Sequence, residues 1–487
     1  MRLLLFIAAA SVLVGCRSTQ IAYHAKVCNA SNCCGPNAVV LTTNASETSS
    51  FSIEELVQLG LASNPSIEEA KQTICSLKQR IPQELSLPDP MVNTATHLAP
   101  VETAAGQQAF ALGVSQKFVN LNRRATKAAM ANDEVCAAKA NLLRLQQQIA
   151  EQIRVACFQL LAIQETIQIT KDDVEILKQI EEVVIRQYEV KQAVSQQDVL
   201  NIQIEQSKVE NQLTDLLQKE KTYSARVSRL VHFEPGMSIV LQDGLGDVAQ
   251  QQDVDSLIAQ ALASRPELAG QLARIRKERR KICLANLQNR PDYTVGLNWI
   301  ATSTNGISPV ANGDDAVLLG IGFNLPVYKN RIRAAACEAK HSSLASQAKL
   351  ASLQDQIAEE VFDSVARLDS TASTISLLRE DIIPKSERTL QIAIEDYSNG
   401  NTDYAQLITN WRSLLQYRIA EANLQSERMQ LLASLGRQLG LIEPVENMGG
   451  LTSLPGLPPN EKEVIVGQDM PKTIENPSTE THQSIKQ

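Results

Sequence analysis

The residues able to do chemistry are few, and no group of them forms a recognisable reaction site. The five histidines stand singly, at His24, His97, His232, His341 and His482. The sequence contains no glycine-rich phosphate loop and no G-x-S-x-G motif, and its carboxylates lie in stretches of helical spacing that solvent would cover. We therefore predict that the protein is not an enzyme and has no catalytic residue, no metal site and no bound cofactor.

One cysteine stands in a context that predicts a covalent modification. Arg2 precedes the run LLLFIAAASVLV (3–14), which is too short to span a bilayer and is typical of a signal peptide. The letters LVGC (13–16) match the bacterial lipobox, in which the cysteine thiol is acylated before cleavage. We expect a lipid on Cys16 and, because Arg17 rather than Asp follows it, retention at the outer membrane. An ordinary signal peptide with an incidental cysteine is the alternative.

The other cysteines suggest cross-links without showing which. Three of them cluster near the N-terminus, at Cys28, Cys33 and Cys34, and five lie in helix-like stretches, at Cys75, Cys136, Cys157, Cys283 and Cys337. The cell envelope permits disulfides, but their pairing does not follow from sequence. We leave disulfides and free thiols open.

The composition favours long helices over compact globular domains. Glycine (21) and proline (18) are scarce for 487 residues, and aromatic residues make up only 4%. The net charge is −8, with lysine and arginine spread along the chain. Because no basic cluster occurs, we expect no nucleic-acid partner.

The chain repeats itself once. The letters LASNP (61–65) return as LASRP (262–266), inside a longer match. Further matches follow in the same order: 87–92 (LPDPMV) with 290–295 (RPDYTV), 112–118 with 319–325, 122–124 (NRR) with 330–333 (NRIR), and 188–200 with 397–408. A period of about 200 residues is far longer than a solenoid unit and indicates a duplicated half-protein.

Each half is expected to begin with a helix that breaks at a proline. Pro65 and Pro266 occupy matching places, and proline is tolerated in a first turn but not inside a helix. Ser52 and Asp253, at the start of each match, suit a helix N-cap.

Two short strands are expected next in each half, near 90–99 and 109–119 and, more clearly, over 293–301 and 317–325. In the second half apolar residues alternate with small or polar ones, at Tyr293, Val295, Leu297 and Trp299 and at Leu319, Ile321 and Phe323. Such alternation is typical of strands and of a barrel with one face in lipid. A hairpin packed on a soluble core is the alternative.

Long helical hairpins complete each half. Apolar residues recur in steps of three and four over 149–177 and again over 199–230, which is the heptad spacing of coiled coils. A helix from about 120 to 190 would be ~105 Å long. Pro384 should kink or interrupt the first arm of the second hairpin.

With these landmarks, the chain resembles the TolC-like outer-membrane efflux factor family over roughly residues 51–440. The resemblance implies a mainly α fold with a small β part, in which coiled-coil hairpins form a periplasmic tunnel. Four strands cannot close a barrel, but three chains would supply twelve, an even number in the accepted range. The expected divisions are a signal peptide (1–15), a lipid-anchored tether (16–50), two outer-membrane efflux repeats (51–235 and 252–440) and a disordered tail (441–487).

The resemblance also implies a function and partners. We expect a homotrimeric export duct in the cell outer membrane, surrounded by lipid, which an adaptor protein opens for an inner-membrane pump or a type I secretion system. Its tip would lie at the two hairpin turns, and the candidate gate residues are Tyr188, Asp198, Tyr397, Gly400 and Asp403. Helix N-capping is the alternative role for the two aspartates. A lipid-anchored coiled-coil adaptor or spacer without a pore is the alternative function.

Overall fold

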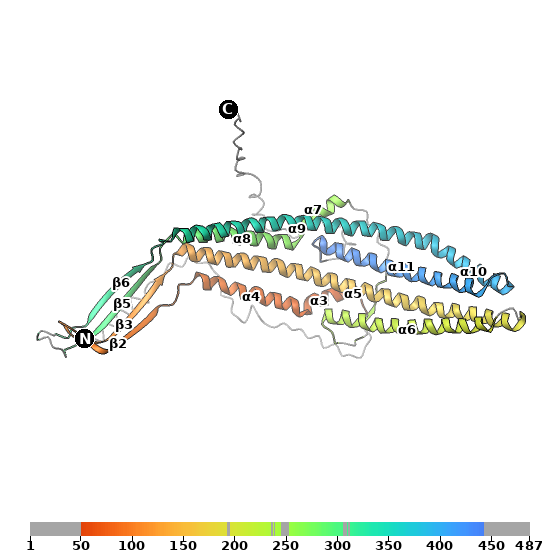
Figure 1. Ribbon diagram of the computed structural model, residues 1–487, viewed down its shortest axis with the longest axis horizontal. Helices are drawn as coiled ribbons and strands as arrows, with labels where there is room; N and C mark the ends of the chain where they lie inside the picture. The colour runs from red at the N-terminus through yellow and green to blue at the C-terminus, as the bar shows by residue number, and fades with distance from the viewer. Residues whose placement is uncertain are drawn as a thin grey trace, which may run out of the picture. The chain divides into compact units, whose positions relative to one another are not determined.

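A computed structural model describes residues 50–191, 195–234, 237, 239–244, 253–304, 309 and 312–442. The predicted signal peptide, the lipid site at Cys16, the three N-terminal cysteines and the predicted tail from residue 443 onward lie outside these residues. The described chain consists mainly of helices, with one four-stranded sheet and one two-stranded sheet (Figure 1). The predicted fold class, mainly α with a small β part, is confirmed.

The elements follow the same order twice. The first series is β1 (Ser50–Phe51), α3 (Ile53–Ser63), α4 (Pro65–Leu85), β2 (Met91–Thr103), β3 (Gly106–Phe118), α5 (Leu121–Lys191) and α6 (Gln196–Val231). The second is β4 (Val240–Leu241), α7 (Val254–Ser264), α8 (Pro266–Leu287), β5 (Tyr293–Ser303), β6 (Ala316–Phe323), α9 (Lys329–Leu377), the π-helical turn η1 (Leu378–Ile382), α10 (Ile383–Asn399) and α11 (Tyr404–Gln438).

The break between the first two helices of each series falls where proline predicts it. Pro65 begins α4 and Pro266 begins α8. Ser52 caps α3 through a reciprocal capping box with Glu55. Asp253 occupies the N-cap of α7, as predicted, but its side chain makes no capping hydrogen bond there.

The four-stranded sheet is antiparallel throughout, in the order β2-β3-β5-β6. Its register agrees with the sequence repeat: Val92 lies opposite Val114, and the aligned residues Val295 and Ile321 lie opposite each other. The first two strands are longer than predicted, because β2 continues to Thr103 beyond an irregularity between Thr96 and Val101.

The long helices pack along one another, as the heptad spacing predicts. Helix α5 has 71 residues, or about 105 Å at 1.5 Å per residue, and packs against α6 and α11 (Figure 1). Most predicted seam positions are buried: Ile149, Ile153, Ala156, Leu160, Ile167, Thr170 and Leu177 of α5, and Ile202, Val209, Leu216, Val227 and Leu230 of α6. The hairpins are therefore held together by burial of this seam.

The predicted interruption at Pro384 takes the form of one π-helical turn. Proline lacks an N–H and its ring crowds the carbonyl of the residue four positions before it. The turn η1 (Leu378–Ile382) widens the helix directly before Pro384, and α10 continues in the same direction (Figure 1). The helix is thus locally rearranged without being ended.

Candidate functional site

The predicted lipid-facing residues gather on one face of the sheet. Tyr293 lies opposite Phe323, Val295 opposite Ile321 and Leu297 opposite Leu319. Residues directly opposite across an antiparallel pair share a face. All six are exposed, with Leu319, Ile321 and Phe323 at 69%, 68% and 60%. Trp299 shares this face but is only half-buried, because its ring meets Phe110 edge-on at 6.2 Å.

The other face of the same strands carries small and polar residues. Thr294 lies opposite Gly322, Gly296 opposite Gly320, and Asn298 opposite Leu318. Leu318 is therefore an apolar exception on this face. One apolar and one polar exposed face is the pattern expected of strands between lipid and a water-filled lumen.

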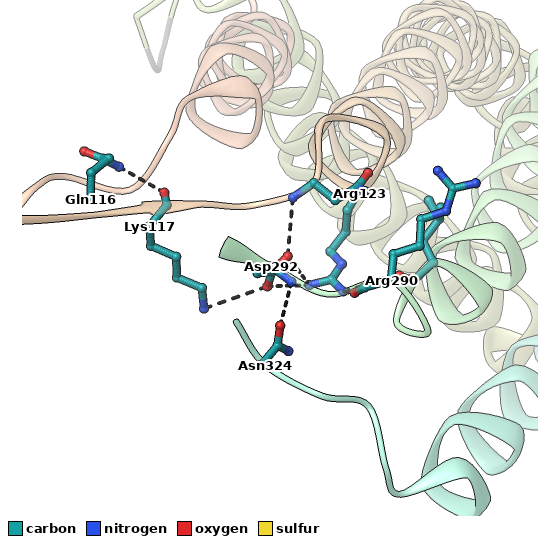
Figure 2. A network of polar contacts seen from close by, with 8 residues as sticks. Gln116, Lys117, Arg123, Arg290, Asp292 and Asn324 are labelled. Carbon is teal, nitrogen blue, oxygen red and sulfur yellow. Dashed lines mark hydrogen bonds and ion pairs between the residues drawn. The ribbon is translucent and has the colours of Figure 1, made fainter. Parts of the chain in front are cut away.

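A buried ionic network joins the strands to the first long helix (Figure 2). Asp292, directly before β5, is only 6% exposed. The Arg123 guanidinium, at the start of α5, donates from Nη1 to both Asp292 carboxylate oxygens, at 3.1 and 2.9 Å. The backbone N–H of Asn120 donates to Oδ1 at 3.3 Å, and Lys117 Nζ lies 3.9 Å from Oδ2. These donors compensate the buried carboxylate.

The same network reaches the neighbouring segments. Arg123 Nη2 donates to the carbonyls of Leu287 and Arg290, at 3.3 and 3.2 Å. The Asp292 N–H donates to Oδ1 of Asn324, just after β6, at 2.5 Å. The network therefore fixes where three adjacent strands meet the helices (Figure 2). The quoted repeats contain Asp292 and Arg123, but no spacing in the sequence relates the two residues.

The structure places the tip candidates at and beside the two hairpin turns. Gly400 ends α10 with φ of +81°, a conformation that glycine adopts without strain. Asp403 caps α11 and accepts from Gln406 N at 2.8 Å. Asp198 belongs to a capping box with Ser195. Both aspartates therefore have the capping contacts of the alternative reading, and their gating role stays a prediction.

The two tyrosine candidates differ in their surroundings. Tyr188 on α5 is 44% exposed, whereas Tyr397 on α10 is only 5% exposed. Burial, together with the negative charge of Asp198, raises the pKa of Tyr397 to about 12. Because the charge of Asp198 acts on Tyr397 from the other hairpin, the structure brings these two gate candidates close together. Gln187 donates to the Ser398 carbonyl between the same hairpins.

An ion pair between the hairpins was missed from sequence. Arg412 of α11 donates from Nη2 to Glu205 of α6 at 2.6 Å, and Lys208 Nζ lies 2.7 Å from the same carboxylate. Burial alone would raise the pKa of Glu205, but the hydrogen bonds from Lys208 and Arg412 bring it below its usual value. Glu205 and Arg412 are 207 positions apart, and no local pattern relates them.

A second buried acid lies deeper in the bundle. Asp173 of α5 is 0% exposed, and within the described residues neither carboxylate oxygen has a hydrogen-bond partner. Burial raises its pKa to about 7, against the opposing effects of Arg418 and Trp411. Sequence periodicity missed this residue because Thr170 and Val174 are the seam positions on either side of it.

Other chemical features of the described chain are limited. Among the cysteines of the described chain, Cys157 is buried, whereas Cys283 and Cys337 are exposed. Over the described ranges, no three His, Cys, Asp or Glu residues come together as a metal site. Where the structure describes helices, none has the length and apolar character needed to cross a bilayer.

Comparisons with known proteins agree with this arrangement. Residues 257–441 match the family described as outer membrane efflux protein. No curated protein matches. The fold is similar to the outer membrane protein VceC of Vibrio cholerae, with a TM-score of 0.66, 18% identity, and coverage of 80% of this chain and 97% of that one.

Two further solved structures share the fold. CusC, described as undergoing conformational changes on folding and transmembrane channel formation, has a TM-score of 0.67, 14% identity, and coverage of 80% and 92% of the two chains. The CmeC outer membrane channel of Campylobacter jejuni has a TM-score of 0.62, 14% identity, and coverage of 80% and 85%. The predicted resemblance is confirmed: residues 257–441 match the model of the outer membrane efflux protein family, and the chain has the fold of the TolC-like outer-membrane channels.

Proposed function

We propose that the protein is a passive export duct of the cell outer membrane, formed by three copies that pool their strands into one barrel. The observation that carries this proposal is the sheet. Its apolar face is exposed, and its edge strands β2 and β6 each have a strand partner on one side only within the described residues. Lipid would cover such a face, and strands of further copies would satisfy the edges.

The long helices would continue the barrel as a tunnel into the periplasm. The described chain has a helix, α5, that is about 105 Å long, beside strands that carry a polar face. The duct would supply no energy, so a pump in the inner membrane and a periplasmic adaptor would drive and open it. A lipid on Cys16 would add a second attachment to the outer membrane.

The gate would lie where the hairpins meet. Tyr397 is buried next to Asp198, and the Glu205–Arg412 pair links α6 to α11. Movement of one hairpin away from the other must separate these groups. Adaptor docking would open the tip by favouring that separated arrangement.

Two neighbouring residues of β6 offer a matched test. Leu319 stands on the apolar face and Leu318 on the opposite face, with exposures of 69% and 48%. Arginine on a lipid-facing strand costs about 2–4 kcal/mol at the bilayer midplane, whereas lumen-facing changes alter selectivity. We expect Leu319→Arg to prevent insertion, and Leu318→Arg to insert with an altered ion preference.

The measurement is single-channel conductance of the purified, full-length protein in a planar lipid bilayer. The unaltered protein should give discrete, long-lived current steps, or, if its tip rests closed, the Arg412→Ala variant should give them. An inserted oligomer that stays silent with Arg412→Ala contradicts the duct. Equal tolerance of arginine at both positions contradicts the assignment of the lipid face.

A further inference from the structure

The ion pair of Arg123 and Asp292 has a counterpart in the other half of the chain. Asp292 precedes β5, and Arg123 is the third residue of α5, which follows the adjacent strand β3. In the repeat, Asp89 stands before β2 as Asp292 stands before β5. Arg331 is the third residue of α9, as Arg123 is of α5.

Within one chain this second pair does not form. β2 and β6 are the two outer strands of the sheet, so Asp89 and Arg331 stand at opposite edges. Both residues are exposed, and in the part of the chain that the structure describes no ion pair joins either one to a partner. Asp292, by contrast, is 6% exposed.

We propose that Arg331 of one copy pairs with Asp89 of the next copy, where β6 of the first meets β2 of the second. The inference rests on the proposed function, because it needs copies arranged around a closed ring. The occupant of each edge is a second copy of this chain, since the repeat supplies the complementary charge at the matching place. Such a head-to-tail contact closes into a ring when its rotation allows.

The repeat also gives the strand register between copies. Within the chain, Gln116 of β3 lies opposite Val295 of β5. Gln116 aligns with Phe323, and Val295 aligns with Val92. Phe323 of one copy should therefore lie opposite Val92 of the next. A slip by one residue would turn the apolar face of one copy toward the lumen side of its neighbour.

Charge reversal tests the ion pair in the full-length protein extracted from membranes. Asp89→Arg and Arg331→Asp should each speed dissociation of the oligomer in detergent by at least about tenfold at a fixed temperature. The combined variant restores opposite charges and should return to within about threefold of the unaltered rate. Arg333→Asp, two residues along the same helix and also exposed, is the matched control and should have no effect.

Disulfide formation tests the register. In a background of Cys283→Ser and Cys337→Ser, the pair Val92→Cys with Phe323→Cys should link copies into covalent dimers and trimers. Thr94→Cys with Phe323→Cys is two residues off register and should link at least about tenfold less, because diagonal neighbours are ~7–8 Å apart. A link closed within one chain, or better linkage off register, overturns the proposal.

The two proposals can fail separately. Single reversals without effect, or a combined variant that stays as unstable as the single ones, overturn the pairing even when the oligomer conducts. An oligomer with the expected links and charge rescue that inserts but never conducts refutes the duct and leaves the pairing standing.

Discussion

Asp173 is the buried group whose titration should most affect stability. Its side chain is fully buried, and among the described residues its carboxylate oxygens accept no hydrogen bond of regular geometry, although the Trp411 indole N–H lies close enough to oppose the rise in its pKa. Burial raises its pKa from 3.8 to about 7, with Arg418 opposing and the neighbouring Asp172 adding to the rise. An ionised Asp173 therefore costs folding free energy that a neutral side chain of the same shape would not.

The size of this cost follows from the shift. A rise of roughly 3 pKa units at 1.36 kcal/mol per unit is about 4 kcal/mol. Because the folded-state pKa lies above the unfolded one, the cost is absent below about pH 4. It grows as pH rises to about 7 and stays constant above that value. With an unfolding entropy of ~2.1 cal/mol/K per residue over 487 residues, it corresponds to about 4 °C in melting temperature.

The test compares melting temperatures of the unaltered protein and Asp173→Asn at pH 4, 6 and 8, at one protein concentration. The variant should gain up to about 4 °C relative to the unaltered protein between pH 4 and pH 8. Asp215→Asn, exposed on α6, is the control and should show no such trend. A difference that stays constant across pH, or a variant less stable at pH 8, would refute the reasoning.

Three further predictions concern the hairpins and the thiols. Gly400→Ala should lower the free energy of unfolding by about 1–2 kcal/mol, seen as a lower melting temperature, because its φ is +81° and nothing else crowds it. Arg412→Ala should raise the open fraction in single-channel recordings, as should Glu205→Gln, since either removes the link between hairpins; an unchanged open fraction in both would contradict that role. Cys157, whose pKa burial raises to about 12, should resist alkylation at pH 8 while exposed Cys283 reacts, as measured by mass spectrometry.

Periodic features of the fold could be predicted from the sequence. The heptad spacing predicted a long helix from about 120 to 190, and α5 runs from Leu121 to Lys191. The repeat aligned 87–92 with 290–295, and the strand register follows the same alignment. Both succeed because burial of an apolar face repeats with the geometry of the helix or strand.

Polar contacts between distant segments could not be predicted in the same way. Arg123 and Asp292 are 169 positions apart, and their pairing depends on which strands become neighbours. Asp253 shows the limit of local reasoning as well: it stands at an N-cap, yet its side chain makes no capping bond. Residue type shows what a side chain is able to do, whereas tertiary structure decides which partner it meets.

The repeat also explains why contacts between copies should be weaker than contacts between the two halves of one chain. Within the chain, the Asp292 carboxylate forms ion pairs with both Arg123 and Lys117. The residue aligned with Lys117 is Asn324, which carries no charge. The contact between copies would thus have one cation where the internal contact has two. We therefore expect each chain to join its own halves first, and mild detergent stress to separate copies before it unfolds them.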